Sequence, residues 1–275
     1  MSGVESYANR NSTDLGRFVE DAQIGEGQYK YVVRGEYRGG DYDGRPNVCK
    51  FLKKHTVFDD RLWLDDVRAC ERALAVIAAF HKYLHETNKP KASIKLNIPQ
   101  VWRQSSEGAK KNQLMLVEPF LDNFSKFNSN TGACKKDESI MQALSHFSYH
   151  ISDGTELLCD MQSQRVGRQN VYVLSDIAIC SEARAYGETD LGARGMENFL
   201  HYHRCGPFCS KAWRTWEGAE QKFQPVMSTS MHTTLEKPAD LTTGETRDCG
   251  PMYPSEIHFS SRRTASAPSS ATGGQ

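Results

Sequence analysis

The stretch YGETDLGARGMENFLHYHRCGPFC, residues 186–209, decides what this chain folds into. It ends with His203, Cys205 and Cys209 spaced as H-x-C-x3-C. Two cysteines four residues apart project from one face of a helical turn, and His203 is close enough to join them. Because a structural zinc site takes four nitrogen or sulfur ligands in a tetrahedron, this stretch supplies three of them. We therefore predict a structural zinc site that is closed by a ligand from elsewhere in the chain.

The fourth ligand has more than one candidate. SHFSYH, residues 145–150, offers His146 and His150, and His201 lies four residues before Cys205. The alternative reading is a pair of buried thiols beside surface histidines. With four protein ligands no coordination position stays open, so the predicted zinc is structural rather than catalytic.

Composition excludes several classes of protein. The 275 residues include 34 Lys plus Arg and 34 Asp plus Glu. Without net positive charge or a long basic run, the chain is not expected to bind nucleic acid or an anionic membrane. The first residues lack the apolar core of a secretory signal, and no run approaches the roughly 18 apolar residues of a membrane span. We expect an intracellular, cytoplasmic protein whose cysteines are thiols or metal ligands. No feature of the sequence sets an oligomeric state.

The hydrophobic pattern predicts an α+β protein with two lobes. Apolar residues recur at helical spacing over 59–85, and Asn, Ser and Gly mark 124–134 as a loop. The other predicted elements are strands over 24–37, 48–52, 113–121, 155–162 and 170–176, and helices over 139–150 and 196–203. We place an N-terminal lobe at 12–120, a C-terminal lobe at 121–221, and a disordered Ser/Thr/Pro/Gly-rich segment at 222–275.

Some features of the N-terminal half suit a nucleotide. Gly25 and Gly27 flank Glu26 in a turn where backbone N–H groups can approach an anion. Lys50 interrupts an apolar strand, either as an edge residue with its ammonium in water or as a contact to phosphates. Glu118 ends another strand, where a carboxylate either faces solvent or reads adenine and ribose at a hinge between lobes.

Polar residues also follow two apolar strands of the C-terminal half. Asp160 and Gln162 follow one strand and Asp176 follows the other. Two carboxylates and an amide oxygen form a hard-oxygen site of the kind that Mg²⁺ prefers, although strand-end aspartates also serve as plain turn formers. Phosphoryl transfer needs such a metal together with a group that orients or deprotonates the attacking hydroxyl.

Taken in order over about residues 15–216, these motifs resemble the alpha-kinases, a family of atypical Ser/Thr protein kinases. The stretch 186–209 looks like the family's glycine-rich loop running into its zinc motif. The other stretches that carry the resemblance are IGEGQYKYV, VCKFL, LVEPFLDNFSKFNSNTG, ALSHFSYHISDGTELLCDMQ and LSDIAI. The resemblance implies a two-lobed, protein-kinase-like fold with an ATP cleft between the lobes and a structural zinc in the C-terminal lobe.

The resemblance also assigns roles to residues. It implies a nucleotide site with the glycine turn and two lysines at the phosphates and a glutamate at the adenine: Gly25, Gly27, Lys30, Lys50 and Glu118. It implies that Asp160 and Gln162 serve the metal and the reacting hydroxyl, and that Asp176 completes the magnesium site. It selects His146 as the fourth zinc ligand. Finally, it implies a peptide-substrate loop that contains Gly187, Gly192 and Gly195.

The chain departs from the family pattern at three positions. Ser163 stands where Gly is usual, Ile177 where Pro is usual and Asp190 where Asn is common. None of these removes a lysine, a carboxylate or a zinc ligand, so we expect an active ATP- and Mg²⁺-dependent Ser/Thr kinase that acts on proteins. The alternatives are a pseudokinase or ATP-binding interaction module that keeps the fold and zinc, and an unrelated zinc-stapled binding domain. The sequence selects neither a substrate protein nor a regulator.

Overall fold

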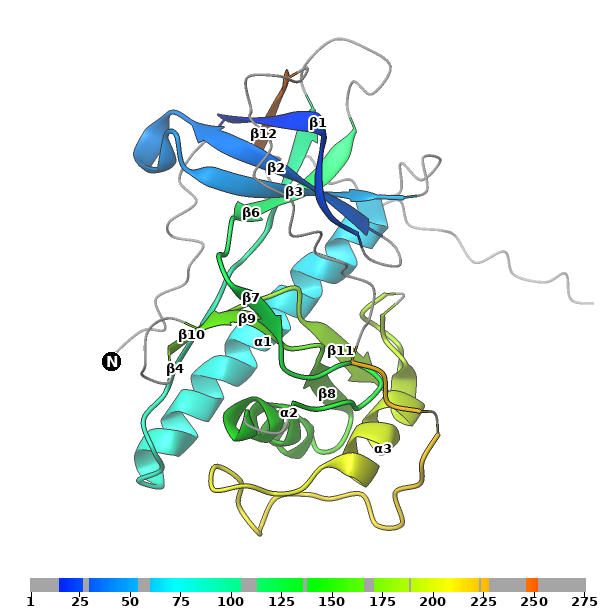
Figure 1. The fold of residues 1–275 in the computed structure, drawn as a ribbon. Helices are drawn as coiled ribbons and strands as arrows, with labels where there is room; N and C mark the ends of the chain where they lie inside the picture. The colour runs from blue at the N-terminus through cyan, green and yellow to red at the C-terminus, as the bar shows by residue number, and fades with distance from the viewer. Residues whose placement is uncertain are drawn as a thin grey trace, which may run out of the picture.

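The upper half of the molecule is a closed barrel of six strands (Figure 1). The computed structural model describes residues 15–26, 30–53, 60–104, 113–135, 138–165, 171–187, 189–222, 224–227 and 246–251. Around the barrel the order is β1 (Leu15–Glu26), β12 (Thr246–Pro251), β5 (Gln100–Gln104), β6 (Leu114–Pro119), β3 (Pro46–Leu52) and β2 (Lys30–Arg38). A short 3-10 turn, η2 (Gly40–Tyr42), joins β2 to β3. The buried side chains that pack together in this half include Phe18, Tyr37, Cys49, Phe51, Trp102, Met115 and Val117.

Strand β12 comes from the segment that was expected to be disordered. Its backbone pairs antiparallel with β1 on one side and with β5 on the other. The expectation of disorder over 222–275 is therefore wrong for Thr246–Pro251, while 228–245 and 252–275 lie outside the described residues. Composition measures how much apolar surface a segment can bury, but two open strand edges supply backbone hydrogen bonds to almost any sequence.

The lower half holds two small sheets and two helices. One sheet has the order β4 (Ser93–Leu96), β10 (Val171–Ser175), β9 (Gln162–Arg165) and β7 (Phe124–Lys126), and the other pairs β11 (Ala178–Ser181) with β8 (Glu156–Cys159). The helices are α2 (Ser139–Ile151) and α3 (Gly192–Tyr202). The predicted loop over 124–134 is thus a strand in its first three residues. Strand β4 pairs in parallel with β10, so residues before 120 also contribute to the lower half.

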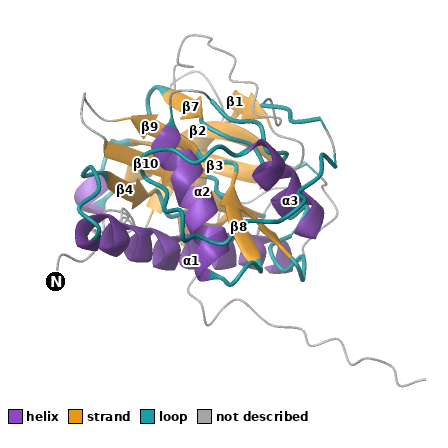
Figure 2. Cartoon of the chain, turned by 90° about the horizontal axis from the view of Figure 1, so that it is seen from below, coloured by secondary structure: helices purple, strands orange, loops and turns teal. Residues whose placement is uncertain are grey.

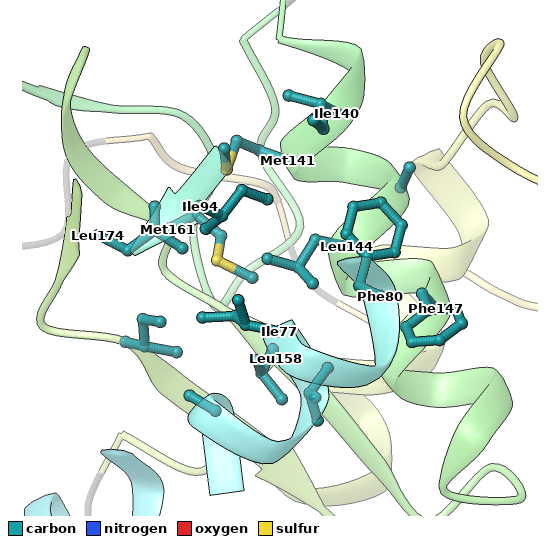
Figure 3. Close-up of a cluster of buried hydrophobic side chains, with 14 of the residues drawn as sticks. Ile77, Phe80, Ile94, Ile140, Met141, Leu144, Phe147, Leu158, Met161 and Leu174 are labelled. Carbon is teal, nitrogen blue, oxygen red and sulfur yellow. The ribbon is translucent and has the colours of Figure 1, made fainter. Parts of the chain in front are cut away.

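Helix α1 (Asp60–Glu86) connects the two halves and confirms the helix predicted from spacing (Figure 1). Near its N-terminus, Trp63 packs with Val101 and Leu116 from strands of the barrel. Further along, Ile77 and Phe80 pack against side chains of α2, including Leu144 and Phe147, in the largest buried cluster (Figure 3). Seen from below, α1 crosses the lower half beside α2 (Figure 2). One rigid element therefore contacts both halves.

Among the described residues, no helix is both long enough and apolar enough to cross a membrane.

Candidate functional site

Lys50 is buried, lies on a central strand of the barrel sheet, and points away from the barrel core toward the lower half. Its strand β3 lies between β2 and β6, so the lysine is not on an edge. Cys49 and Phe51 pack into the barrel, and strand alternation turns Lys50 to the opposite face, where it is only 4% exposed. Lys50 Nζ lies 2.6 Å from Glu118 Oε1 and 3.3 Å from Asp176 Oδ1. The edge-lysine alternative is therefore wrong.

Glu118 uses its carboxylate to hold this lysine. In β6, Val117 packs into the barrel and Glu118 points the other way. Its two carboxylate oxygens also accept hydrogen bonds from Ser175 Oγ in β10, at 2.9 and 2.8 Å. The same alternation that buries Glu118 directs its carboxylate to Lys50. Ser175 links the barrel to the lower half across this point.

The charges of this cluster support one another. Burial alone would lower the pKa of Lys50, but Asp176 and Glu118 outweigh burial and raise it. Burial would raise the pKa of Asp176, but Lys50, Lys30 and Lys126 reverse that effect and lower it. For Glu118, burial raises the pKa and Lys50 offsets part of the rise. The ammonium of Lys50 and the carboxylate of Asp176 consequently remain charged at neutral pH.

Asp160 and Asp176 occupy equivalent positions, each directly after a strand. Both have left-handed backbones, with φ of 58° and 56°. Among residues other than glycine this conformation is uncommon, and aspartate tolerates it better than most. The Asp160 carboxylate forms an ion pair with Lys126 and accepts a hydrogen bond of 3.0 Å from Gln162 Nε2. The charge of Lys126 also lowers the pKa of Asp176, so this lysine acts on both aspartates.

Sequence reasoning assigned no role to Lys126 or to Asn128, two residues further on. Asn128 is fully buried, and its Oδ1 accepts a hydrogen bond of 2.8 Å from the backbone N–H of Met161. Its Nδ2 donates to Ser145 Oγ at 3.0 Å. Asn128 thus fixes the backbone between Asp160 and Gln162. The signal was present in the K-F-N stretch, which the resemblance included without naming a function for it.

Lys30 lies beside the same cluster and is held from α1. Its Nζ is 2.5 Å from Asp66 Oδ1. Burial opposes its charge, but Asp66 and Asp176 outweigh burial and raise its pKa. Asp66 is a third residue that sequence reasoning missed. Gly25 is buried near the end of β1, and Gly27 lies outside the described residues.

Four possible metal ligands come together in the lower half. One donor atom each from His146, His203, Cys205 and Cys209 lies within 4.8 Å of all the others. His146 Nδ1 is 3.6 Å from Cys205 Sγ, and His203 Nε2 is 3.7 Å from Cys209 Sγ. His146 Nε2 lies 2.9 Å from the carbonyl oxygen of Arg214, which can only accept a hydrogen bond. That nitrogen therefore carries the proton, and the lone pair of Nδ1 faces the cluster.

The competing histidines have other partners. His150 Nδ1 accepts a hydrogen bond of 3.3 Å from the backbone N–H of Arg214. His201 Nδ1 lies 2.8 Å from the carbonyl oxygen of Ala219. The structure therefore brings His146, and neither alternative, to the other three donors.

The electrostatics of the cluster fit a bound cation. Burial, with His146 and Arg204 nearby, lowers the pKa of His203 to about 4 and keeps its ring neutral. Burial raises the pKa of the Cys209 thiol to about 12. A neutral imidazole is ready to ligate, and a buried thiolate becomes favourable when a cation lies beside it. Lys89, just beyond α1, donates to the carbonyl oxygens of Pro207 and Cys209 at 2.7 and 3.1 Å and holds the loop that carries the ligands.

The three glycines of the predicted substrate loop have different structural roles. Gly187 and Gly192 have positive φ, 79° and 68°, which explains glycine at both turns. Gly195, by contrast, lies inside α3, where an added Cβ would be 2.5 Å from Cys180 Sγ. It allows α3 to pack on β11 and is not part of the loop.

A buried lysine held by two carboxylates therefore lies between the barrel and the lower half, near a second Asp–Lys pair and a glutamine. Residues 25–209 match the model of the alpha-kinase family, and this chain belongs to that family. Myosin heavy chain kinase D of Dictyostelium discoideum is 30% identical over 109 residues, which make up 39% of this chain and 11% of that protein. Eukaryotic elongation factor 2 kinase of Caenorhabditis elegans is 31% identical over 153 residues, 55% of this chain and 18% of that protein. The chain thus spans less than a fifth of either relative.

Solved structures show the same fold. An inactive variant of the alpha-kinase domain of myosin-II heavy chain kinase A, solved in complex with ATP, superimposes with a TM-score of 0.57 at 19% identity, covering 72% of this chain and 96% of that one. An alpha-kinase from Entamoeba histolytica gives a TM-score of 0.59 at 19% identity, covering 83% and 95%. The kinase-like fold expected from the sequence is therefore confirmed.

Proposed function

We propose that this chain is an ATP- and Mg²⁺-dependent protein kinase that transfers the γ-phosphoryl group to Ser or Thr hydroxyls of protein substrates. The observation that carries this proposal is Lys50, buried and charged between Glu118 and Asp176. Burying an ammonium costs free energy that even a good ion pair often fails to recover. A buried lysine that faces the lower half therefore indicates a function for its charge. The family match and the neighbour solved with ATP support the nucleotide.

On this proposal, Lys50 and Lys30 contact the phosphates, and the backbone of Gly25 and Gly27 completes the phosphate loop. Glu118 keeps Lys50 in place, and its strand end remains the proposed position of the adenine. Ion pairs within the cluster hold both ammonium groups before the nucleotide arrives, so little reorganisation is needed on binding.

The acceptor side consists of Asp160, Gln162 and Asp176. When bound, Mg²⁺ neutralises charge on the phosphates. Gln162 and Asp176 are the proposed oxygen ligands, and Asp160 orients the substrate hydroxyl and takes its proton. As the new O–P bond forms, the bond from the γ-phosphorus to the bridging oxygen breaks and ADP leaves. Lys126 forms an ion pair with Asp160 and orients its carboxylate until the hydroxyl replaces the lysine as a partner.

We also propose that His146, His203, Cys205 and Cys209 hold a structural Zn²⁺. Two neutral imidazoles and two thiols within 4.8 Å of one another match the donor set of a closed zinc site. His146 belongs to α2, which leads directly into the strand before Asp160. The metal would therefore stabilise the part of the lower half that carries the chemistry.

The alternative is a pseudokinase or ATP-binding module that keeps the fold and zinc. Phosphate transfer from labelled ATP to a threonine-bearing peptide, with Mg²⁺, separates the two. We expect transfer by the wild type and none by Asp160→Ala. Nucleotide binding without transfer in both proteins would favour the pseudokinase. Zinc content of the purified protein, measured by mass spectrometry, tests the metal: less than one zinc per chain contradicts its assignment.

A further inference from the structure

The segment between β11 and α3 is folded around one buried carboxylate. Asp190 Oδ1 accepts hydrogen bonds from the backbone N–H groups of Ser181 and Gly192, at 2.8 and 2.9 Å. Its Oδ2 accepts from Ser181 Oγ at 2.6 Å and from the N–H of Tyr186 at 3.3 Å. All four partners are hydrogen-bond donors. This explains why residue 190 is an aspartate here, because the side-chain NH₂ of an asparagine would point at other donors. Residues 181–187, called the 181–187 loop below, are thus held together by the carboxylate of Asp190.

A second set of contacts attaches this loop to the rest of the lower half through Glu156 in β8. Tyr186 donates its hydroxyl to Glu156 Oε1 at 2.6 Å. Arg72 of α1 donates from Nε to the other oxygen, Oε2, at 2.5 Å. Burial, aided by the carboxylate, raises the pKa of Tyr186 to about 12, so its hydroxyl remains a donor. One carboxylate therefore joins the loop to α1.

The same part of α1 reaches the nucleotide side. Arg68 donates to the carbonyl oxygen of Ala185 at 3.0 Å. A Cβ on Gly187 would lie 3.1 Å from Asp65 Oδ2, so the loop runs against the helix there. The next residue, Asp66, pairs with Lys30. Two turns of α1 thus contact both the 181–187 loop and a lysine beside the buried charge cluster.

We propose that Arg72, Glu156 and Tyr186 are positioning residues that hold the 181–187 loop against α1 and thereby fix Gly187, where the proposed peptide-substrate loop begins. This inference rests on the proposed kinase function. Because the loop is preset, a substrate does not have to order it on binding, and loss of the clamp raises the KM for protein more than the KM for ATP. None of the three residues contacts the reacting groups.

Steady-state kinetics with a synthetic threonine-bearing peptide test the proposal, with Tyr186→Phe, Glu156→Gln and Arg72→Met. We expect the peptide KM to rise about fivefold for Tyr186→Phe, the loss of about one net hydrogen bond, with the KM for ATP unchanged. Because both partners act through Glu156, the double variant of Arg72 and Tyr186 should raise the KM by less than the product of the single effects. Lys82→Met, which removes an exposed cation from the same helix, is the matched control.

Hydrogen exchange gives a readout that does not depend on activity. The N–H groups of Arg184 and Ala185 bond to Ser181 within the loop, and we expect faster exchange there in Tyr186→Phe than in the Lys82→Met control. Equal rises in both KM values, or unchanged exchange, would overturn the clamp. If the wild type does not phosphorylate the peptide, the proposed function fails, and the exchange rates still decide whether the clamp exists.

Discussion

The two polar clusters of this protein balance their charges in opposite ways. In the Lys50 cluster each of three lysines has an anion from the chain itself: Lys50 has Glu118 and Asp176, Lys126 has Asp160, and Lys30 has Asp66. The Cys/His cluster instead consists of four nitrogen and sulfur donors that lie within 4.8 Å of one another. A charge network that pairs internally can fold before its ligand binds, whereas converging lone pairs gain their stability from a cation. The difference predicts that substitutions in the Lys50 cluster reduce activity and that substitutions in the Cys/His cluster reduce stability.

The largest expected effect on activity is at Asp160. Asp160→Asn removes the proposed proton acceptor and should lower kcat by about a thousandfold or more, while the melting temperature stays within a few degrees of the wild type. Peptide phosphorylation and thermal unfolding measure the two quantities. Asp41→Asn, at an exposed position of the short turn η2, is the control and should keep wild-type kcat. A melting temperature that falls as steeply as kcat would remove the distinction between the clusters.

The Cys/His cluster should show the reverse pattern. His146→Gln removes one of the four donors, and we expect the protein to lose zinc and more than about 3 kcal/mol of unfolding free energy. His150→Gln is matched in chemistry and lies on the same helix, but it removes a bond to the backbone of Arg214 and a stacked contact with Trp213, and it should keep zinc at a cost of about 1 kcal/mol. Metal analysis and denaturant unfolding decide between them, and zinc loss in the second variant alone would restore His150 as the ligand.

Within the Lys50 cluster, Glu118→Gln sharpens the comparison because it removes the charge of the side chain but keeps its shape. Lys50 would keep Asp176 but lose its shortest ion pair, and we expect kcat/KM for ATP to fall about ten- to hundredfold. Much of the loss should appear in the KM for ATP, since the lysine is proposed to contact phosphates. Titration of nucleotide binding by calorimetry checks this, and wild-type affinity would show that Asp176 alone positions the lysine.

The sequence predicted what depends on local pattern and missed what depends on long-range pairing. Helix α1 followed from spacing, and the H-x-C-x3-C motif brought its three donors together as expected. Spacing alone could not choose between His146 and His150, because both lie on the same helix, far from Cys205 in the sequence, and only the fold directs one of them toward it. The ion pair between Glu118 and Lys50 was missed for the same reason: strand alternation shows that Glu118 points away from Val117, but not that Lys50 lies on that side. Partners such as Lys126 and Asp66 come from other elements, so no local signal announced their pairing.

Strand β12 is the clearest case of long-range pairing, and truncation tests it. A chain that ends at residue 227 leaves the edges of β1 and β5 unpaired, and we expect it to lose about 2 kcal/mol of unfolding free energy. A chain that ends at residue 251 keeps the strand and should match the full-length protein. Denaturant unfolding compares the two, and equal stability would show that the barrel does not need its sixth strand.

His81 gives the smallest effect and shows a third way to bury a polar group, with neither an ion pair nor a metal. Its Nε2 accepts a hydrogen bond of 3.0 Å from the N–H of Ile94, which ties α1 to β4 and requires a neutral ring. Burial lowers the pKa of His81 below its ordinary value near 6.5. Its contribution is therefore complete above that value and is lost as the pH falls toward the folded pKa, because the unfolded chain takes up the proton first. Unfolding free energies measured between pH 7.5 and about 5 should fall more steeply for the wild type than for His81→Gln, and equal slopes would mean that the imidazole is protonated at the same pH in both states.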